Sequence, residues 1–154
     1  TGEDALTQGA GHLIGSSLPV GGSGTHCVLA GHRGLPSSKL FTDLDLVKEG
    51  DLLYLHVLDQ TLGYEVDQIR IVEPKETESL KIQPEEDLVT LVTCTPYGVN
   101  TQRLLVRGHR IELTEETLEE AVPVRLSTKT NYLLIAFIGL AVVAGIAAIY
   151  RKVS

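Results

Sequence analysis

Thr90-Leu91-Val92-Thr93-Cys94, followed by Thr95-Pro96-Tyr97-Gly98 and then by Gln102-Arg103, is the stretch on which the predicted fold depends. Its first part is a β-branched, apolar run typical of a buried strand, and the proline and glycine after it mark a turn. An arginine opens the next apolar run, so the pattern predicts a strand, a loop and a second strand. If these strands pair antiparallel, the Cys94 thiol and the Arg103 guanidinium lie at the same end of the sheet.

Further apolar runs predict a mostly β domain of about six or seven short strands, with a closed or nearly closed sheet. The other runs that predict strands are 25–30, 52–58, 64–72 and 103–113, the last bent near Gly108. Residues 59–63 have the length and the glycine of a hairpin loop. Short helical turns, indicated by apolar spacing or by a capping residue, are predicted within 35–47, 78–82 and 114–119.

His32 follows the strand predicted over 25–30, with Gly31 before it and Gly34 soon after it. Side chains at the end of a strand reach the rim of a sheet, where binding and catalytic groups are often placed. A thiol near a cation forms a thiolate that attacks carbonyl carbon, a histidine protonates the leaving amine, and a guanidinium stabilises negative charge on oxygen. The residues alone leave a second interpretation open, in which Cys94 is a small apolar core residue.

The other cysteine and histidines are predicted to be structural. Cys27 lies inside an apolar strand and is interpreted as an inert buried thiol, although two cysteines leave a disulfide with Cys94 open. His12 is expected to bond to loop backbone, and His56 lies in the middle of a strand. No pair of ligands has metal-site spacing, so neither a metal nor a cofactor is predicted.

The composition favours one folded domain and argues against nucleic acid as a partner. The chain has 154 residues, of which 43% are hydrophobic, and its formal net charge is −7. This length suits a single domain with a hydrophobic core. Acidic residues are concentrated within 73–87 and 112–120, where they would repel a phosphate backbone.

Residues 132–150, YLLIAFIGLAVVAGIAAIY, carry no charge and are predicted to be a transmembrane helix. At about 1.5 Å of rise per residue, the run spans roughly 30 Å, the thickness of a bilayer's hydrocarbon core. A buried core helix of this length normally has a polar face, which the run lacks. Arg151 and Lys152 indicate a cytoplasmic tail, so the preceding domain is expected outside the cell.

Two stretches, TLVTCTPYG at 90–98 and NTQRLLVRGHR at 100–110, resemble sortases, most closely the class C or pilin sortases. AGHRGLPSSKLFTDL at 30–44 and GAGHLIGSSLPVGG at 9–22 extend the resemblance to nearly everything from Gly9 to Ile111. The TLxTC pattern followed by an arginine strand, with the histidine upstream, is its most specific part.

The resemblance implies an eight-stranded β-barrel in which Cys94 is the nucleophile, His32 the general acid or base, and Arg103 the substrate- and oxyanion-stabilising arginine. It implies cleavage of an LPXTG-like sorting signal between threonine and glycine, through a thioester on Cys94. In class C enzymes a lysine amine of another pilin subunit then resolves the thioester into an isopeptide bond. The alternatives are a housekeeping sortase that anchors surface proteins to peptidoglycan, and a non-catalytic, membrane-tethered β-barrel binding module.

Two departures from the class C pattern affect these expectations. Class C members commonly carry histidine before the catalytic arginine, where this chain has Gln102. The family's first barrel strand and its N-terminal lid, with an Asp-Pro-aromatic plug, have no counterpart, so an open sheet edge is expected. The expected organisation is a truncated catalytic domain (1–124), a linker (125–131), a membrane helix (132–150) and a tail (151–154), anchored in a Gram-positive cell membrane.

Overall fold

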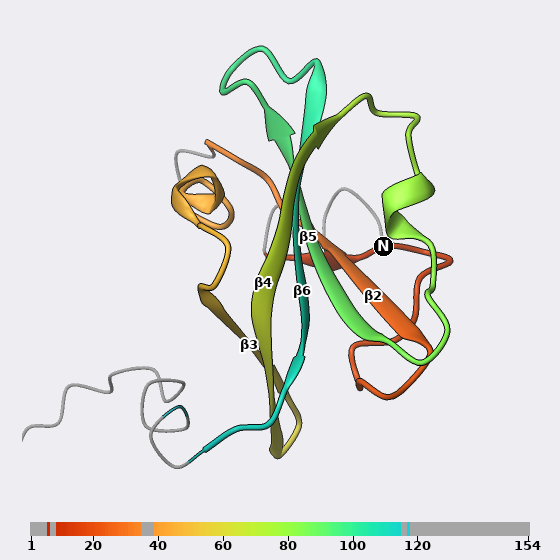
Figure 1. Ribbon diagram of the computed structural model, residues 1–154. Helices are drawn as coiled ribbons and strands as arrows, with labels where there is room; N and C mark the ends of the chain where they lie inside the picture. The colour runs from red at the N-terminus through yellow and green to blue at the C-terminus, as the bar shows by residue number, and fades with distance from the viewer. Residues whose placement is uncertain (1–5, 7–8, 35–38, 115–116, 118–154) are drawn as a thin grey trace, which may run out of the picture. The chain divides into compact units, whose positions relative to one another are not determined.

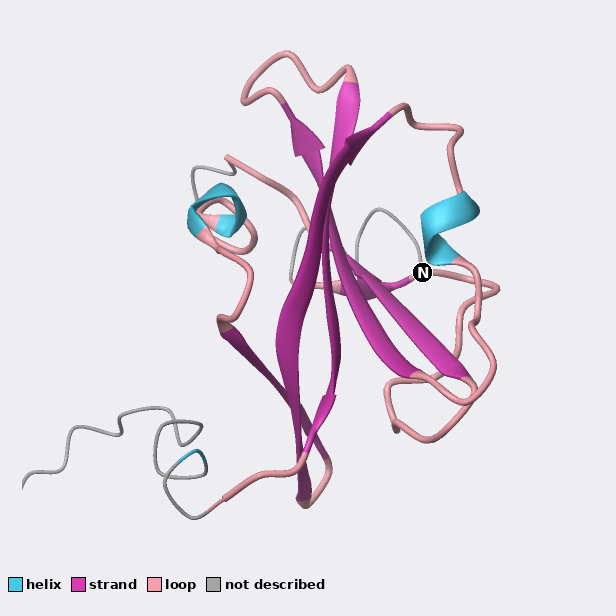
Figure 2. Ribbon diagram, viewed as in Figure 1, coloured by secondary structure: helices cyan, strands magenta, loops and turns pink. Residues whose placement is uncertain are grey.

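The computed structural model describes residues 6, 9–34, 39–114 and 117, and these residues form a mostly β structure (Figures 1 and 2). The strands are β1 (Gly11–His12), β2 (Thr25–Ala30), β3 (Leu52–Val57), β4 (Gln60–Val72), β5 (Asp87–Thr95) and β6 (Gln102–Ile111). Two 3-10 turns lie in the connections, η1 (Leu44–Leu46) and η2 (Glu78–Leu80).

All six strands belong to one sheet, in the order β1-β2-β5-β6-β4-β3. Neighbouring strands are antiparallel except β2 and β5, which run parallel. The long strands β4 and β6 run side by side in Figure 1. This order places β5, which carries Cys94, between β2, which leads into His32, and β6, which carries Arg103.

The expected mostly β fold with few helices is confirmed, but the described strands form an open sheet instead of a closed barrel. Within the described residues, β1 and β3 each pair with one neighbour and are the two edges of the sheet. An edge strand presents unpaired backbone N–H and C=O groups. β5 lies away from both edges and is paired with β2 as far as Val92 and with β6 along nearly its whole length, where Cys94 lies opposite Arg103.

Two clusters of buried side chains fix the central strands. One consists of Cys27, Leu62, Tyr64 and Val89, and the other of Leu44, Val66, Leu104 and Val106. Complete burial of a valine or leucine side chain contributes about 1.5–3 kcal/mol to folding. Because β5 and β6 supply three of these eight residues, the strands beside the candidate site are held by core packing.

A β-bulge in β4 lies opposite the bend that the sequence predicts at Gly108. The register shifts between Val66, which faces Gly108, and Gln68, which faces Arg107. The residue between them, Asp67, accepts hydrogen bonds from Nε and Nη2 of Arg107 at 3.0 and 2.8 Å. A bulge increases the local twist of a strand pair, and this bidentate ion pair stabilises it on the half-buried face.

The predicted hairpin between β3 and β4 is correct, but its predicted loop over 59–63 is wrong. The strands are joined by Leu58 and Asp59, with Leu58 at φ 55°. Gly63 instead lies within β4, opposite Tyr54. A Cβ atom at Gly63 would lie 2.3 Å from Cδ2 of Leu113, so this glycine allows close packing of a neighbouring side chain.

The predicted helical turns are shorter than the apolar spacing indicates. In the described part of 35–47 the helical segment is η1, and in 78–82 it is η2. The expected linker (125–131), membrane helix (132–150) and tail (151–154) lie outside the described residues. Within the described ranges, no helix has the length and apolar character needed to cross a bilayer.

Candidate active site

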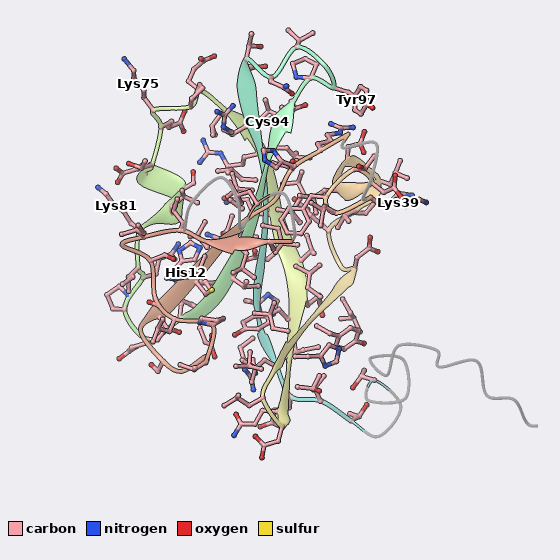
Figure 3. All side chains as sticks on the ribbon, turned by 180° about the vertical axis from the view of Figure 1, so that it is seen from behind. His12, Lys39, Lys75, Lys81, Cys94 and Tyr97 are labelled. Atoms are coloured by element: carbon pink, nitrogen blue, oxygen red, sulfur yellow. The ribbon has the colours of Figure 1, made fainter. Side chains whose placement is uncertain are left out.

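Cys94 and Arg103 are cross-strand partners in the antiparallel β5–β6 pair. Cys94 is the next-to-last residue of β5 and Arg103 the second residue of β6, so both lie at the end of the pair next to the connecting loop. Directly opposed residues in such a pair present their side chains on the same face of the sheet. The expected juxtaposition of thiol and guanidinium is therefore present. Figure 3 shows Cys94 and Tyr97 at this end, far from His12.

His32 reaches the same place through the parallel pairing of β2 with β5. The pairing ends with Ala30 opposite Val92, and the Gly31 amide still donates to the Val92 carbonyl at 3.0 Å. The buried Thr93 hydroxyl donates to the Gly31 carbonyl at 2.8 Å. These two bonds hold the backbone just before His32 against the backbone just before Cys94.

A cavity of about 180 Å³ brings the three predicted site residues together. Its lining consists of Leu6, Ala30, Gly31, His32, Val92, Thr93, Cys94 and Arg103. A thiol, an imidazole and a guanidinium around one small cavity are the groups needed for nucleophilic attack, proton transfer and stabilisation of developing oxyanion charge.

The Arg103 guanidinium is oriented by the backbone of its own loop. Its Nη1 donates to the carbonyl oxygens of Asn100 and Gln102 at 3.2 and 3.0 Å. No carboxylate of the described residues forms an ion pair with it, which leaves its charge available to a ligand. Gln102, which differs from the class C pattern, donates from its side chain to Glu73 at 3.3 Å.

An apolar groove of about 260 Å³ adjoins the cavity and shares Ala30, Val92 and Arg103 with it. The rest of its lining comes from the segment after β1, from β2, β6 and the end of β4, and from the β4–β5 connection: Leu13, Val28, Val72, Pro74, Glu76, Thr77, Leu80 and Leu105. Aliphatic walls that lead to a guanidinium and a thiol suit an extended peptide with apolar side chains.

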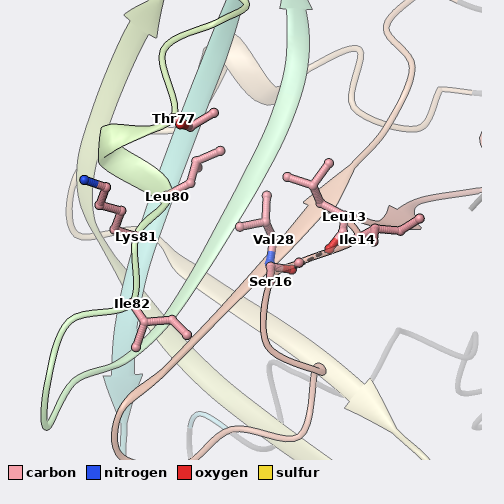
Figure 4. A pocket seen from close by; sticks show the side chains of 9 residues that line it. Leu13, Ile14, Ser16, Val28, Thr77, Leu80, Lys81 and Ile82 are labelled. Atoms are coloured by element: carbon pink, nitrogen blue, oxygen red, sulfur yellow. Dashed lines mark hydrogen bonds between the residues drawn. The ribbon is translucent and has the colours of Figure 1, made fainter.

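A larger cavity, of about 530 Å³, contains none of the three site residues (Figure 4). It lies between the segment after β1 and the η2 region, and Leu13, Val28, Thr77 and Leu80 line both it and the groove. In Figure 4, Leu80 and Ile82 point toward Val28 and Leu13 from the opposite wall.

The two cysteines differ in environment, and both are free thiols. Cys27 is 3% exposed, and burial, assisted by the negative charge of Asp87, raises its pKa to about 11. Cys94 is half-buried at the cavity. The interpretation of Cys27 as a buried thiol is confirmed, and the disulfide alternative is wrong for this structure.

Three other histidines have hydrogen-bond partners within the domain. His12, in β1, has its Nε2 3.0 Å from the Ser17 carbonyl oxygen, which is the predicted bond to loop backbone, and His56 Nδ1 lies 3.0 Å from the Thr61 hydroxyl. His26, which the sequence pattern did not single out, is fully buried. Its Nδ1 donates to the Lys81 carbonyl at 2.9 Å, and its Nε2 lies 2.7 Å from the Thr90 hydroxyl. Burial lowers the pKa of His26.

A family model described as the sortase domain matches residues 1–111. The chain belongs to the sortase family. Sortase A of Streptococcus agalactiae is 30% identical to it over 135 residues, which cover 84% of this chain and 53% of that relative. The chain thus spans about half the length of the curated relatives it matches.

Among solved structures, the sortase domain is similar to class C sortases. Sortase C of Streptococcus pneumoniae is 60% identical, with a TM-score of 0.73, covering 74% of this chain and 60% of that one. Clostridium perfringens sortase C, solved with the C-terminal cell wall sorting motif, is 56% identical, with a TM-score of 0.70, covering 73% of this chain and 61% of that one.

Proposed function

We propose that this sortase is a cysteine transpeptidase that acts on an LPXTG-like sorting signal. The observation that carries the proposal is the small cavity lined by His32, Cys94 and Arg103, with an apolar groove that opens onto it. The groove suits the apolar part of the signal, and the cavity then receives the threonine carbonyl. The sorting motif present in the C. perfringens sortase C structure supports this class of substrate.

The chemistry follows from the three groups. The Cys94 thiolate attacks the threonine carbonyl carbon, and Arg103 stabilises the negative charge that develops on oxygen. The threonine–glycine C–N bond breaks, and the glycine amine leaves with a proton from His32. The product is a threonyl thioester on Cys94 and a free glycine-containing fragment.

The acceptor in this proposal is a lysine amine of another pilin subunit. The neutral amine attacks the thioester carbonyl, His32 takes a proton from it, and Cys94 leaves as thiolate, so that an isopeptide bond forms. The similarity to class C structures favours this acceptor. A housekeeping sortase, which would use a peptidoglycan amine, is the second candidate, because the curated relatives include enzymes named sortase A.

The same proposal includes a membrane location with the catalytic domain on the extracellular side. Residues 132–150 are uncharged, and Arg151 and Lys152 follow them. Such a run is long enough to span the hydrocarbon core, and flanking basic residues favour the cytoplasmic face.

Peptide cleavage by the full chain in detergent tests the reaction. A quenched fluorescent LPXTG peptide should be cleaved between threonine and glycine, and mass spectrometry should show the threonyl adduct on Cys94. Cys94→Ala should abolish both signals, while Cys27→Ala should retain them. If Cys94→Ala cleaves at the wild-type rate, Cys94 is not the nucleophile and the proposed mechanism is wrong. If the wild-type chain cleaves no peptide, the binding-module alternative is supported.

An acceptor competition separates the two candidate enzymes. The preformed thioester is offered a lysine-containing pilin peptide and a peptidoglycan-type amine at equal concentration. Faster transfer to the lysine side chain supports pilus assembly, whereas faster transfer to the peptidoglycan amine supports the housekeeping alternative.

A further inference from the structure

The segment that carries His32 is held on one side by the region around η1. The His32 carbonyl accepts a hydrogen bond from the Phe41 amide at 3.2 Å, and the Gly34 amide donates to the Thr42 hydroxyl at 3.1 Å. The Phe41 ring also lies close to Gly31, where an added Cβ atom would be 2.7 Å from Cδ2 of the ring. The backbone on both sides of His32 therefore has fixed neighbours.

On its other side, the same segment contacts the loop that follows Cys94. The guanidinium carbon of Arg33 lies 5.7 Å from the centroid of the Tyr97 ring, within the range of a cation–π interaction. A Cβ atom at Gly34 would lie 2.6 Å from Cε2 of the same ring. Gly34 has φ +79°, a conformation that glycine adopts without steric cost. The Tyr97 ring thus packs against Arg33 and Gly34, the two residues that follow His32.

Arg33 links this contact to η1. Its Nη2 pairs with the Asp45 carboxylate, and its side chain is 10% exposed while that of Asp45 is 45% exposed. A planar guanidinium can bond to a carboxylate through one edge and present its face to an aromatic ring, which an ammonium group cannot do. The Arg33 side chain therefore connects η1, the His32 segment and the Cys94 loop.

We propose that Arg33 and Tyr97 form a clamp that fixes the separation between His32 and Cys94. Both are positioning residues: each neighbours a reacting group along the chain, Arg33 directly after His32 and Tyr97 three residues after Cys94. The Thr93–Gly31 hydrogen bond joins the two segments before the reacting residues, and the clamp joins them after. A misplacement of about 1 Å between reacting groups can cost about a hundredfold in rate.

A solvent-exposed surface aromatic with no such role is the simpler interpretation of Tyr97, which is 60% exposed. Two observations argue against it. The guanidinium that faces the ring is nearly buried, and the residue beneath the ring lacks a side chain that would displace it. The high exposure of Tyr97 has a practical benefit, because replacing an exposed side chain changes stability little.

The test compares Tyr97→Ala with Tyr97→Phe, which keeps the ring, and with Val99→Ala, a 64% exposed neighbour in the same loop. The readout is the rate of Cys94 alkylation by iodoacetamide as a function of pH. All variants also carry Cys27→Ala, so that Cys94 is the single cysteine, and His32→Ala gives the reference profile of a thiol without the histidine. Tyr97→Ala should move the profile toward that of His32→Ala, whereas Tyr97→Phe and Val99→Ala should follow the wild type. Arg33→Lys should give an intermediate profile.

The effect on peptide cleavage rests on the proposed function. We expect Tyr97→Ala to lower kcat by about 10- to 100-fold with little change in KM, since the clamp lies outside the groove. A wild-type alkylation profile in Tyr97→Ala overturns the clamp, whatever the peptide assay gives. If the wild-type chain cleaves no LPXTG peptide but the profile still depends on Tyr97 and His32, the proposed function fails and the clamp stands.

Discussion

The Thr93 hydroxyl donates a 2.8 Å hydrogen bond to the Gly31 carbonyl, so the residue before Cys94 is tied to the residue before His32. Thr93 is 2% exposed. Gly31 is buried as well, so a Gly31 carbonyl that loses this donor is poorly compensated by water. Thr93, in the TLVTC stretch, therefore helps to hold the site residues together.

Thr93→Val should therefore destabilise the domain by about 1–3 kcal/mol, because it replaces the hydroxyl by a methyl group of similar size and leaves a buried acceptor unpaired. Urea unfolding monitored by circular dichroism measures the loss. Thr93→Ser is the control: it keeps the donor and loses one buried methyl, worth about 0.8 kcal/mol. Equal stability of Thr93→Val and the wild type would contradict the assigned hydrogen bond.

Selective labelling should distinguish the two thiols. Burial raises the pKa of Cys27 to about 11, and the thiolate is the reactive form, so Cys27 should stay unmodified at pH 8. Mass spectrometry after iodoacetamide treatment of the folded chain should find one adduct, on Cys94. A second adduct should appear only after unfolding in urea. Labelling of Cys27 in the folded Cys94→Ala variant would show that β2 is more accessible to solvent than the burial of Cys27 indicates.

Arg103→Lys should lower the acylation rate nearly as much as Arg103→Ala, because an ammonium group cannot reproduce two bonds to loop carbonyls while also facing the cavity. Loss of an oxyanion-stabilising donor costs roughly 100- to 1,000-fold in rate. Single-turnover kinetics with the LPXTG peptide measure it. Arg110→Lys, at the other end of β6, is the control and should retain the wild-type rate. Recovery of the rate by Arg103→Lys would reduce the role of Arg103 to charge alone.

Acid should destabilise the domain partly through His26. Burial lowers its pKa in the folded state, so below about pH 6.5 the unfolded chain binds a proton at this histidine that the folded chain excludes. The resulting stability is present above the unfolded-state pKa and is lost as the pH falls toward the folded-state value. Thermal unfolding from pH 7.5 to 5 should show a smaller decrease in Tm for His26→Asn than for the wild type. Parallel curves would contradict this assignment.

The sequence was informative where structure is local or periodic. The β-branched apolar runs of β2, β5 and β6 identify these strands within a residue or two, because a buried strand needs such side chains along its whole length. The expectation that Cys94, His32 and Arg103 share one end of the sheet needed only an antiparallel pair and a parallel neighbour, and both are present.

The remaining features depend on contacts distant in sequence. Gly63 resembles a turn residue, and nothing nearby indicates that Leu113 packs over it. His26 gave no signal of its own, because its partners Thr90 and Lys81 lie more than 50 positions away. The contact between Arg33 and Tyr97 is equally non-local. The one local signal is that Arg33 directly follows His32, the candidate general acid, where an arginine can help to position it.

The parallel pairing of β2 with β5 determines when the site can appear during folding. The Gly31–Thr93 bond joins residues 62 positions apart, and a loop of that size must close before any part of the pairing is gained. No shorter stretch of chain can bring the imidazole to the thiol. A newly made or partly folded polypeptide that lacks this pairing therefore has Cys94 without His32 beside it, and the proposed acyl transfer requires that β2 and β5 have already paired.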